Sequence, residues 1–274
     1  MRGNRRYAKR ILVVSGGYVL LVIVMSLLAP VIAPYDPLEI NGLNTLAPPS
    51  LLNLFGTDEF GRDILSRLLY GGQPSLLVAT GATILSILLG TTLGLIAGYF
   101  GGVLEQVIMR LVDTLLTFPP ILLAMVVVGF LQTGVIPLII TIGILYATTF
   151  ARLAYATTLQ VKQNEYVIAA EALGASHFRR IRICILPNIA SALIVQASLT
   201  IAAVILLESG LSFLGLGIVP PAPSWGLMVG AARGYMFQAP TYVLFPSLIV
   251  ATMVLAVNAF GDALRDVLDP RSRS

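Results

Sequence analysis

Long stretches without Asp, Glu, Lys or Arg restrict how this chain can fold more than any other feature. They include residues 11–35, 71–104, 114–151 and 234–261. A bilayer core about 30 Å thick is crossed by about 20 apolar helical residues. Only 11% of the residues are charged and 57% are hydrophobic, whereas soluble domains average about 25% and about 45–50%. The chain is therefore predicted to be an all-α, polytopic integral membrane bundle and not a water-soluble enzyme.

The uncharged stretches predict six membrane spans. A Gln-Thr-Gly turn followed by Pro137 divides the longest stretch in two. The stretch 209–232 is rich in Pro and Gly, so much of it is expected to form an external loop with room for a short helix. The predicted spans are residues 11–33, 75–99, 107–131, 135–155, 189–213 and 242–263.

The basic residues orient this arrangement. Lys and Arg are enriched in cytoplasmic loops, and alternating loops place 14 basic residues on one side and 3 on the other. We therefore expect both termini in the cytoplasm. The resulting divisions are an N-terminus 1–10, a first span 11–33, an extracytoplasmic loop 34–74, a five-helix core 75–263 and a cytoplasmic tail 264–274. The core contains a cytoplasmic loop 160–187 and an extracytoplasmic loop 214–241.

Two features inside the spans predict how they pack. Pro119-Pro120 should interrupt the third span, either as a kink or as a break that lines a cavity. A repeat of small residues in the second span favours close approach of a neighbouring helix, and it consists of Gly90, Gly94, Gly98 and Gly102. Near the third span, Arg110 and Asp113 are one turn apart and are expected to pair locally.

Glu208 lies deeper in a predicted span than the other acidic residues. An ionisable side chain at such a depth should face the bundle interior or a cavity. Two roles are open. Glu208, together with Ser212, can belong to a translocation path or gate, or the carboxyl can form structural hydrogen bonds to a neighbouring helix.

The cytoplasmic loop 160–187 is predicted to contain two short helices. Asn164 is suited to cap the first helix and Glu165 complements its dipole, while Gly174 should end it. Ser176 can cap a second helix that ends near Pro187. This shape suits docking into a cleft of another protein. The alternative is an amphipathic loop lying on anionic lipid, which would be favoured by Arg179, Arg180 and Arg182.

This loop resembles the "EAA" loop of binding-protein-dependent ABC importer permeases. The matching positions are Ile168-Ala169-Ala170, Gly174 and Cys184-Ile185-Leu186-Pro187, with Ile168 replacing the acidic residue and Cys184 replacing isoleucine. Further blocks resemble the C-type subunit of the dipeptide/oligopeptide/nickel permease family. They are residues 55–63, 66–71, 208 with 211–217, the Pro-rich segment ending at 226, and 261–270.

The resemblance implies a type I ABC importer permease (MetI-like) fold with six transmembrane helices in the bacterial inner membrane. It implies a homologous B-type permease, two ABC ATPase subunits that bind ATP and Mg, and an extracytoplasmic binding protein as partners. Short peptides are the expected substrates, and nickel or metal chelates, glutathione, and opines or glycosides are alternatives. The residues expected to couple to the ATPase are Glu165, Ala169, Ala170, Glu171, Gly174, Ala175, Ser176, Arg179, Leu186 and Pro187.

Several other functions lack the residues they need. The sequence has no G-x-x-x-x-G-K-[ST] motif, and its one cysteine and one histidine exclude Cys- and His-cluster metal sites. We therefore expect no catalytic residue, no cofactor and no metal in this chain. A net charge of +4 is too small to indicate nucleic-acid binding. The rival class is an ion-coupled secondary transporter, for which Glu208 alone offers thin support.

Overall fold

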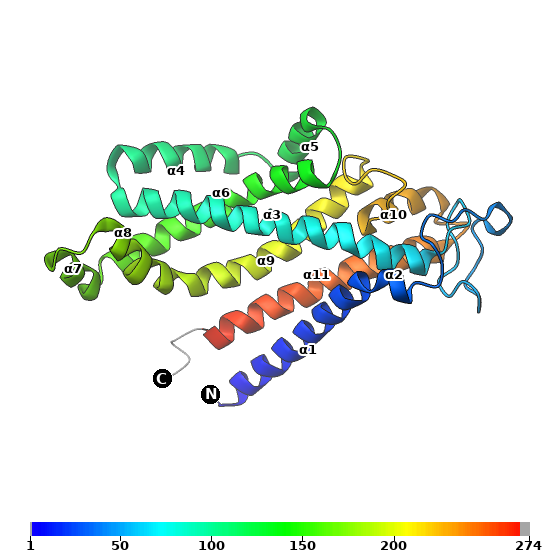
Figure 1. The fold of residues 1–274 in the computed structure, drawn as a ribbon, viewed down its shortest axis with the longest axis horizontal. Coiled ribbons are helices and arrows are strands. Elements are labelled where there is room, and N and C mark those ends of the chain that lie inside the picture. The colour runs from blue at the N-terminus through cyan, green and yellow to red at the C-terminus, as the bar shows by residue number, and fades with distance from the viewer. Residues whose placement is uncertain (1, 269–274) are drawn as a thin grey trace.

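The computed structural model describes residues 2–268, which form a bundle of helices elongated along one axis (Figure 1). All the elements within that range are helices, so the predicted all-α class is confirmed. Among residues 2–268, five helices are long and apolar enough to cross a membrane. They are α1 (Arg2–Leu27), α3 (Ile64–Phe100), α6 (Val135–Lys162), α9 (Leu186–Phe213), which continues an upstream helical turn from His177, and α11 (Pro240–Leu268).

The third predicted span is not one continuous helix over 107–131. It consists of α4 (Gly102–Leu116) and α5 (Pro120–Leu131), which meet at an angle of 95°. The pair makes a sixth span only when both helices are counted together. Proline restricts the residue before it to extended backbone, which ends α4 ahead of Pro119. Pro120 then suits the first turn of α5, where no N–H is needed.

Helix α3 begins at Ile64 and not at the predicted residue 75, so residues 64–74 are helical and not loop. The carboxylate of Asp63 caps this helix by accepting a hydrogen bond of 2.8 Å from the Ser66 N–H. In the first turn of α3, Arg67 is buried and donates to the carbonyl of Pro37 at 2.9 Å. The first helix is also shifted, because α1 ends at Leu27 and a short α2 (Ala29–Ile32) follows.

The glycine repeat brings α3 and α6 into close contact, as predicted. A methyl group on Gly90 would lie 2.6 Å from the Cβ of Phe150, and one on Gly94 would lie 2.8 Å from the Cβ of Ala154. Both distances are shorter than real Cβ contacts, so only glycine permits this separation. Gly102 differs from the other members of the repeat, because it starts α4 with a φ of +63° and has open space around it.

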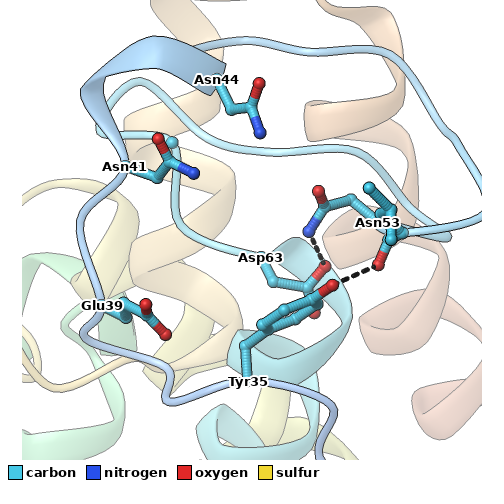
Figure 2. Close-up of a pocket in the computed structure, with 8 residues that line it drawn as sticks. Tyr35, Glu39, Asn41, Asn44, Asn53 and Asp63 are labelled. Atoms are coloured by element: carbon cyan, nitrogen blue, oxygen red, sulfur yellow. Dashed lines mark hydrogen bonds between the residues drawn. The ribbon is translucent and has the colours of Figure 1, made fainter.

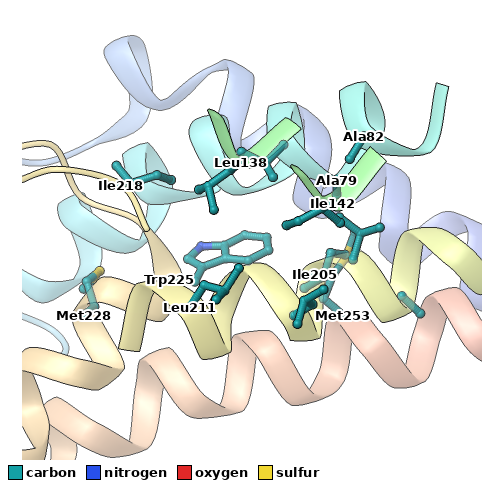
Figure 3. Packing of buried hydrophobic residues seen from close by; sticks show 14 of the residues in the cluster. Ala79, Ala82, Leu138, Ile142, Ile205, Leu211, Ile218, Trp225, Met228 and Met253 are labelled. Atoms are coloured by element: carbon teal, nitrogen blue, oxygen red, sulfur yellow. The ribbon is translucent and has the colours of Figure 1, made fainter. Parts of the chain in front are cut away.

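One part of the core surrounds a single tryptophan (Figure 3). Trp225 begins α10 (Trp225–Ala232), the short helix for which the loop 214–241 has room. Its indole is 1% exposed and donates a hydrogen bond of 3.0 Å to the carbonyl of Leu68 on α3. Leu138, Ile142 and other apolar side chains of α3, α6, α9 and α11 complete the cluster. The loop is therefore packed into the bundle.

The two ends of the bundle are different. The N-terminal end of α1, the C-terminal end of α11, and the short helix α7 (Glu165–Ala172) lie at one end, whereas residues 34–63 and α10 lie at the other (Figure 1). The basic residues Arg271 and Arg273, which contributed to the predicted orientation, lie outside the described residues. The structure thus separates a loop end from a terminal end along the long axis.

Candidate functional site

The predicted coupling segment forms a short helix with a defined stop. Asn164 occupies the N-cap position of α7, but its side chain does not accept a capping bond and instead donates to the Tyr166 hydroxyl at 3.3 Å. Asn164 therefore has the predicted position at the start of the helix, but the predicted capping hydrogen bond from its side chain is wrong. Gly174 ends the helix with a φ of +75°, and the N–H groups of Gly174 and Ala175 bond back to Glu171 and Ala170 at 2.9 and 3.0 Å.

The second predicted helix does not end at Pro187. Ser176 caps α8 (His177–Arg179) by accepting from the Arg179 N–H at 3.4 Å. A wide π-turn, η2 (Arg180–Ile185), then leads directly into α9. Pro187 lies in the first turn of α9. Proline lacks a backbone N–H, and at this position, after a wide turn, its absence costs little stability. The Asn188 side chain donates to the Cys184 carbonyl at 2.6 Å.

The coupling segment leaves apolar side chains uncovered at the terminal end. Leu173 is 88% exposed, Phe178 is 70% exposed and Ile168 is 55% exposed. Large apolar side chains exposed within one short segment make it a candidate interaction surface. None of the predicted coupling residues is buried. Ala170 and Ala175 are half-buried, and the others are exposed, namely Glu165, Ala169, Glu171, Gly174, Ser176, Arg179, Leu186 and Pro187.

A polar cluster joins this segment to the end of α3. The Tyr99 hydroxyl lies 2.9 Å from His177 Nδ1, and Arg180 Nη2 lies 3.0 Å from the same nitrogen. Arg180 also pairs with Glu171 at 2.7 Å, and Lys162 Nζ donates to the Tyr99 carbonyl at 2.6 Å. The cluster therefore ties α3, α6, α7 and α8 together. The sequence offered no signal for Tyr99, because 78 positions separate it from His177.

Glu208 lies inside the bundle and is 0% exposed. Its Oε1 accepts a hydrogen bond of 2.7 Å from the Ser212 hydroxyl. The hydroxyls of Ser75, Ser209 and Ser224 face the same carboxyl. Of the four serines, only Ser212 meets the geometric criteria for a hydrogen bond to Glu208. Glu208 is thus surrounded by polar groups of α3, α9 and the start of α10.

The serines around Glu208 also bond to backbone N–H groups between residues 218 and 227. The hydroxyl of Ser75 accepts from the Trp225 N–H at 3.4 Å, and that of Ser224 accepts from the Leu227 N–H at 3.2 Å. Ser212 accepts from the Ile218 N–H at 3.4 Å. Of these three hydroxyls, that of Ser212 also donates to Glu208 Oε1.

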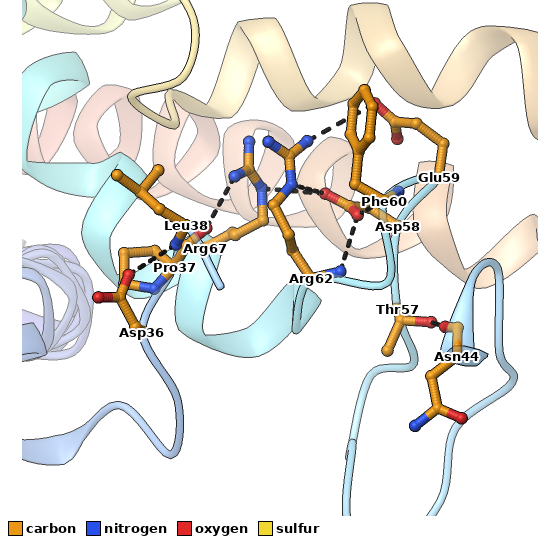
Figure 4. A network of polar contacts seen from close by, with 10 residues as sticks. All are labelled: Asp36, Pro37, Leu38, Asn44, Thr57, Asp58, Glu59, Phe60, Arg62 and Arg67. Carbon is orange, nitrogen blue, oxygen red and sulfur yellow. Dashed lines mark hydrogen bonds and ion pairs between the residues drawn. The ribbon is translucent and has the colours of Figure 1, made fainter. Parts of the chain in front are cut away.

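At the loop end, a buried carboxylate shapes residues 34–63 (Figure 4). Asp58 is 0% exposed, and its Oδ2 lies 2.6 Å from Arg62 Nε and 3.3 Å from Arg67 Nε. Its Oδ1 accepts from the N–H groups of Phe60 and Arg62, both at 2.9 Å. Thr57 bonds to the Asn44 carbonyl in the same region. These bonds fold the loop tightly onto the start of α3.

A small polar pocket of about 180 Å³ lies within the same loop (Figure 2). Asn53 donates to Asp63 at 3.0 Å, and the Tyr35 hydroxyl donates to the Leu52 carbonyl at 3.0 Å. Glu39, Asn41 and Asn44 are the other labelled residues that line it. Within residues 2–268 no group of three His, Cys, Asp or Glu side chains is arranged to hold a metal ion.

Comparison with known proteins defines the class. The model of the family described as binding-protein-dependent transport system inner membrane component matches residues 90–274. The model of the N-terminal TM domain of oligopeptide transport permease C matches residues 5–49. The chain belongs to the family of binding-protein-dependent transport system inner membrane components, and it is a permease subunit of an ABC importer and not an enzyme. The resemblance seen in the sequence is confirmed.

Curated relatives match nearly the whole chain. The dipeptide transport system permease protein DppC of Haemophilus influenzae is 42% identical over 93% of this chain and 88% of its own length. The di/tripeptide transport system permease protein DppC of Pseudomonas aeruginosa is 41% identical over 94% and 87%. The glutathione transport system permease protein GsiD of Pectobacterium atrosepticum is 39% identical over 98% and 90%.

A solved structure supports the fold. A chain of the MetNI methionine ABC transporter, in inward-facing conformations, superposes with a TM-score of 0.63 and 19% identity, covering 75% of this chain and 98% of that chain. The expected type I importer permease fold is therefore confirmed. Together with the apolar helices, the family places this chain in the inner membrane as a multi-pass protein.

Proposed function

We propose that this chain forms one half of the translocation path of an ATP-driven importer for short peptides. The observation that carries the proposal is its 42% and 41% identity to dipeptide and di/tripeptide permeases over nearly its full length. The other half would be a homologous B-type permease. An extracytoplasmic binding protein would deliver the peptide, and two ABC ATPase subunits would bind ATP and Mg.

The uncovered end of the coupling segment is the proposed contact with an ATPase. Leu173, Phe178 and Ile168 supply the apolar area there, and the defined turn at Gly174 presents α7 as a rigid unit. Motion of α7 would reach the membrane helices through Arg180, which contacts both Glu171 and His177. The ATPase partners would thus hydrolyse ATP. This chain would supply a part that switches between two conformations, and the partners would favour one or the other.

The proposed orientation places α7 and both termini in the cytoplasm. These elements share one end of the bundle (Figure 1), and 14 of the basic residues fall on that side of the predicted topology. Residues 34–63 and α10 would then face the binding protein on the outer side.

Glutathione is the second candidate substrate, because a glutathione permease is 39% identical over 98% of this chain. Glutathione is itself a tripeptide with free charged groups, so both candidates make similar demands on a path. No comparable observation favours metal chelates, opines or glycosides.

We further propose that Glu208 and Ser212 position a gate from inside the protein. Their hydrogen bonds reach Ile218, in the segment that leads into α10. Breaking that centre would loosen the segment without removing a peptide contact.

Uptake by the complete transporter in lipid vesicles tests this function. With binding protein, radiolabelled L-alanyl-L-alanine and ATP on the ATPase side, we expect accumulation that stops when ATP is replaced by a non-hydrolysable analogue. Uptake driven by an ion gradient in the absence of ATP would instead support the secondary-transporter class. Competition by glutathione separates the two substrate candidates.

A further inference from the structure

Two arginines of this chain pair with a carboxylate on another helix, in different settings. Arg152 of α6 pairs with Asp113 of α4 at 2.6 Å, so the predicted local pair between Asp113 and Arg110 is wrong. Both of these side chains are more than half exposed, and such a pair contributes little stability. Arg180 is different, because its side chain is only 9% exposed and lies 2.7 Å from Glu171 of α7. It links α7 to the bundle from a buried position.

The guanidinium of Arg180 lies between two acceptors. Its Nη1 contacts Glu171 Oε2 at 2.7 Å, and its Nη2 lies 3.0 Å from His177 Nδ1 on α8. The guanidinium carbon is 5.6 Å from the centre of the Tyr99 ring. Helices α7 and α8 lie close together at the terminal end of the bundle (Figure 1). Each amino group of Arg180 thus has its own partner, and the position of the guanidinium depends on both.

The contact with Arg180 determines which nitrogen of His177 carries the proton. A guanidinium has N–H donors and no acceptor. His177 Nδ1 therefore offers its lone pair to Arg180, and the proton of the neutral imidazole belongs on Nε2. The Tyr99 hydroxyl faces the same Nδ1 at 2.9 Å. The hydrogen bond that holds Arg180 against α8 thus exists only with a neutral imidazole in this tautomer.

A second proton on His177 would break this contact. The imidazolium carries an N–H on both nitrogens, so Nδ1 would lose its lone pair and a positive ring would face the positive guanidinium of Arg180 at 3.0 Å. Lys162 of α6 adds to the positive charge, because its Nζ lies 5.5 Å from the centre of the Tyr99 ring. Glu171 of α7 is the carboxylate of this cluster, and it already binds Arg180.

The protonated ring has another partner within reach. Its Nδ1–H can donate to the Tyr99 hydroxyl, whose oxygen has lone pairs. Arg180 would then keep only Glu171, which is 63% exposed. The connection between α8 and α3 would persist, whereas the connection between α8 and α7 through Arg180 would open. His177 is exposed, so protons reach it from water, and histidine is the side chain that changes charge between about pH 5 and pH 8.

We propose that His177 is the positioning residue of the coupling segment, which holds Arg180 against α7 when neutral and releases it when protonated. The inference rests on the proposed function, because it takes α7 as the contact with an ATPase. Only the released arrangement binds the extra proton. Each pH unit below the range where a solvated imidazole titrates therefore favours release by up to about tenfold. Coupling is present at higher pH and is lost as the pH falls.

The state of the imidazole is the first arm of the test. The chain contains one histidine, so labelling this chain alone with ¹⁵N-histidine, and purifying it through a tag without histidine, gives one imidazole signal in the assembled transporter. At about pH 8, we expect the ¹⁵N chemical shifts to show a proton on Nε2 and none on Nδ1 of His177. A proton on Nδ1 at that pH would overturn the proposal, because Arg180 would have no acceptor there.

The pH profile of coupling is the second arm. In vesicles with the pH changed on the ATPase side only, L-alanyl-L-alanine taken up per ATP hydrolysed should fall about threefold or more between about pH 8 and about pH 5.5. His177→Gln keeps an acceptor oxygen for Arg180 and does not titrate, so its ratio should stay nearly constant over the same range. An equal fall in both transporters would place the pH effect in another group and would refute the proposal.

A variant without an acceptor separates positioning from packing. His177→Phe keeps an aromatic ring but offers nothing to Arg180, so we expect a low ratio of uptake to ATP hydrolysis at both pH values. A ratio equal to that of the unmodified transporter at about pH 8 would also refute the proposal. Failure of the proposed function differs from these results, because the unmodified transporter would then show no ATP-dependent peptide uptake at either pH, while the ¹⁵N signal of His177 would be unaffected.

Discussion

Single side chains carry out two separate tasks in this permease. Glycines in α3 remove bulk where α6 approaches, and Glu208 collects hydroxyl groups where three segments meet. In both cases the chemistry of the individual residue limits how far the surrounding helices can move. We therefore expect these positions to be sensitive to substitution.

Gly94→Leu should destabilise the permease by about 1–3 kcal/mol, because added atoms in a packed interface force neighbouring groups apart. The Cβ alone would lie 2.8 Å from the Cβ of Ala154. Gly129→Leu is the matched control, since a Cβ there meets nothing within 4 Å. Thermal unfolding of the purified protein in detergent measures both. Equal melting temperatures for the two variants would contradict the close packing.

Glu208→Ala should cost about 1–3 kcal/mol, because it leaves the buried hydroxyl of Ser212 without its acceptor. Glu208→Gln keeps one acceptor oxygen next to Ser212 and should retain most of the stability and uptake. Melting temperature and peptide uptake are measured together for both variants. Loss of uptake in Glu208→Gln at an unchanged melting temperature would show that the charge acts in transport, and a positioning role would be wrong.

At the scale of elements, breaks in helices matter as much as the helices themselves. The chain stops α7 at Gly174 and turns sharply between α4 and α5, yet continues through Pro187 into α9. The difference lies in the turn before each proline. A wide π-turn accommodates Pro187. Proline instead disfavours helical backbone in the residue before it, so α4 ends ahead of Pro119-Pro120.

Gly174→Trp should uncouple ATP hydrolysis from uptake. A φ of +75° disfavours any residue with a Cβ, so the end of α7 would change direction, and the new ring would alter the proposed ATPase contact. We expect uptake to fall about tenfold or more while the subunits still assemble. Gly17→Trp on α1, where a Cβ meets nothing within 4 Å, is the control. Normal uptake by an assembled Gly174→Trp transporter would argue against this segment as the coupling element.

At the scale of the whole molecule, the bundle has a terminal end and a loop end with different chemistry. The terminal end holds the exposed apolar residues of the coupling segment, and the loop end holds the buried Asp58 ion pairs. An importer needs such a difference, because energy enters on one side and solute on the other.

A reporter fused to the C-terminus after Arg273 should give a cytoplasmic signal. The expectation follows from the excess of basic residues on the side of the termini. Alkaline phosphatase, which is active outside the cytoplasm, and green fluorescent protein, which is fluorescent inside, provide opposite readouts. Phosphatase activity from the full-length fusion would reverse the orientation and with it the assignment of α7 to the ATPases.

Amino-acid composition and local backbone chemistry were sufficient to predict a membrane bundle, a close approach of some neighbouring helix to the glycine repeat, and the stop at Gly174. These features depend on hydropathy, on small side chains at regular spacing, and on glycine at positive φ, all of which are properties of neighbouring residues. The 95° break, the early start of α3, and the partners of Asp113, Tyr99 and Glu208 could not be predicted in this way. They depend on which helices meet in space. The sequences of apolar helices with similar composition do not indicate which helix packs against which.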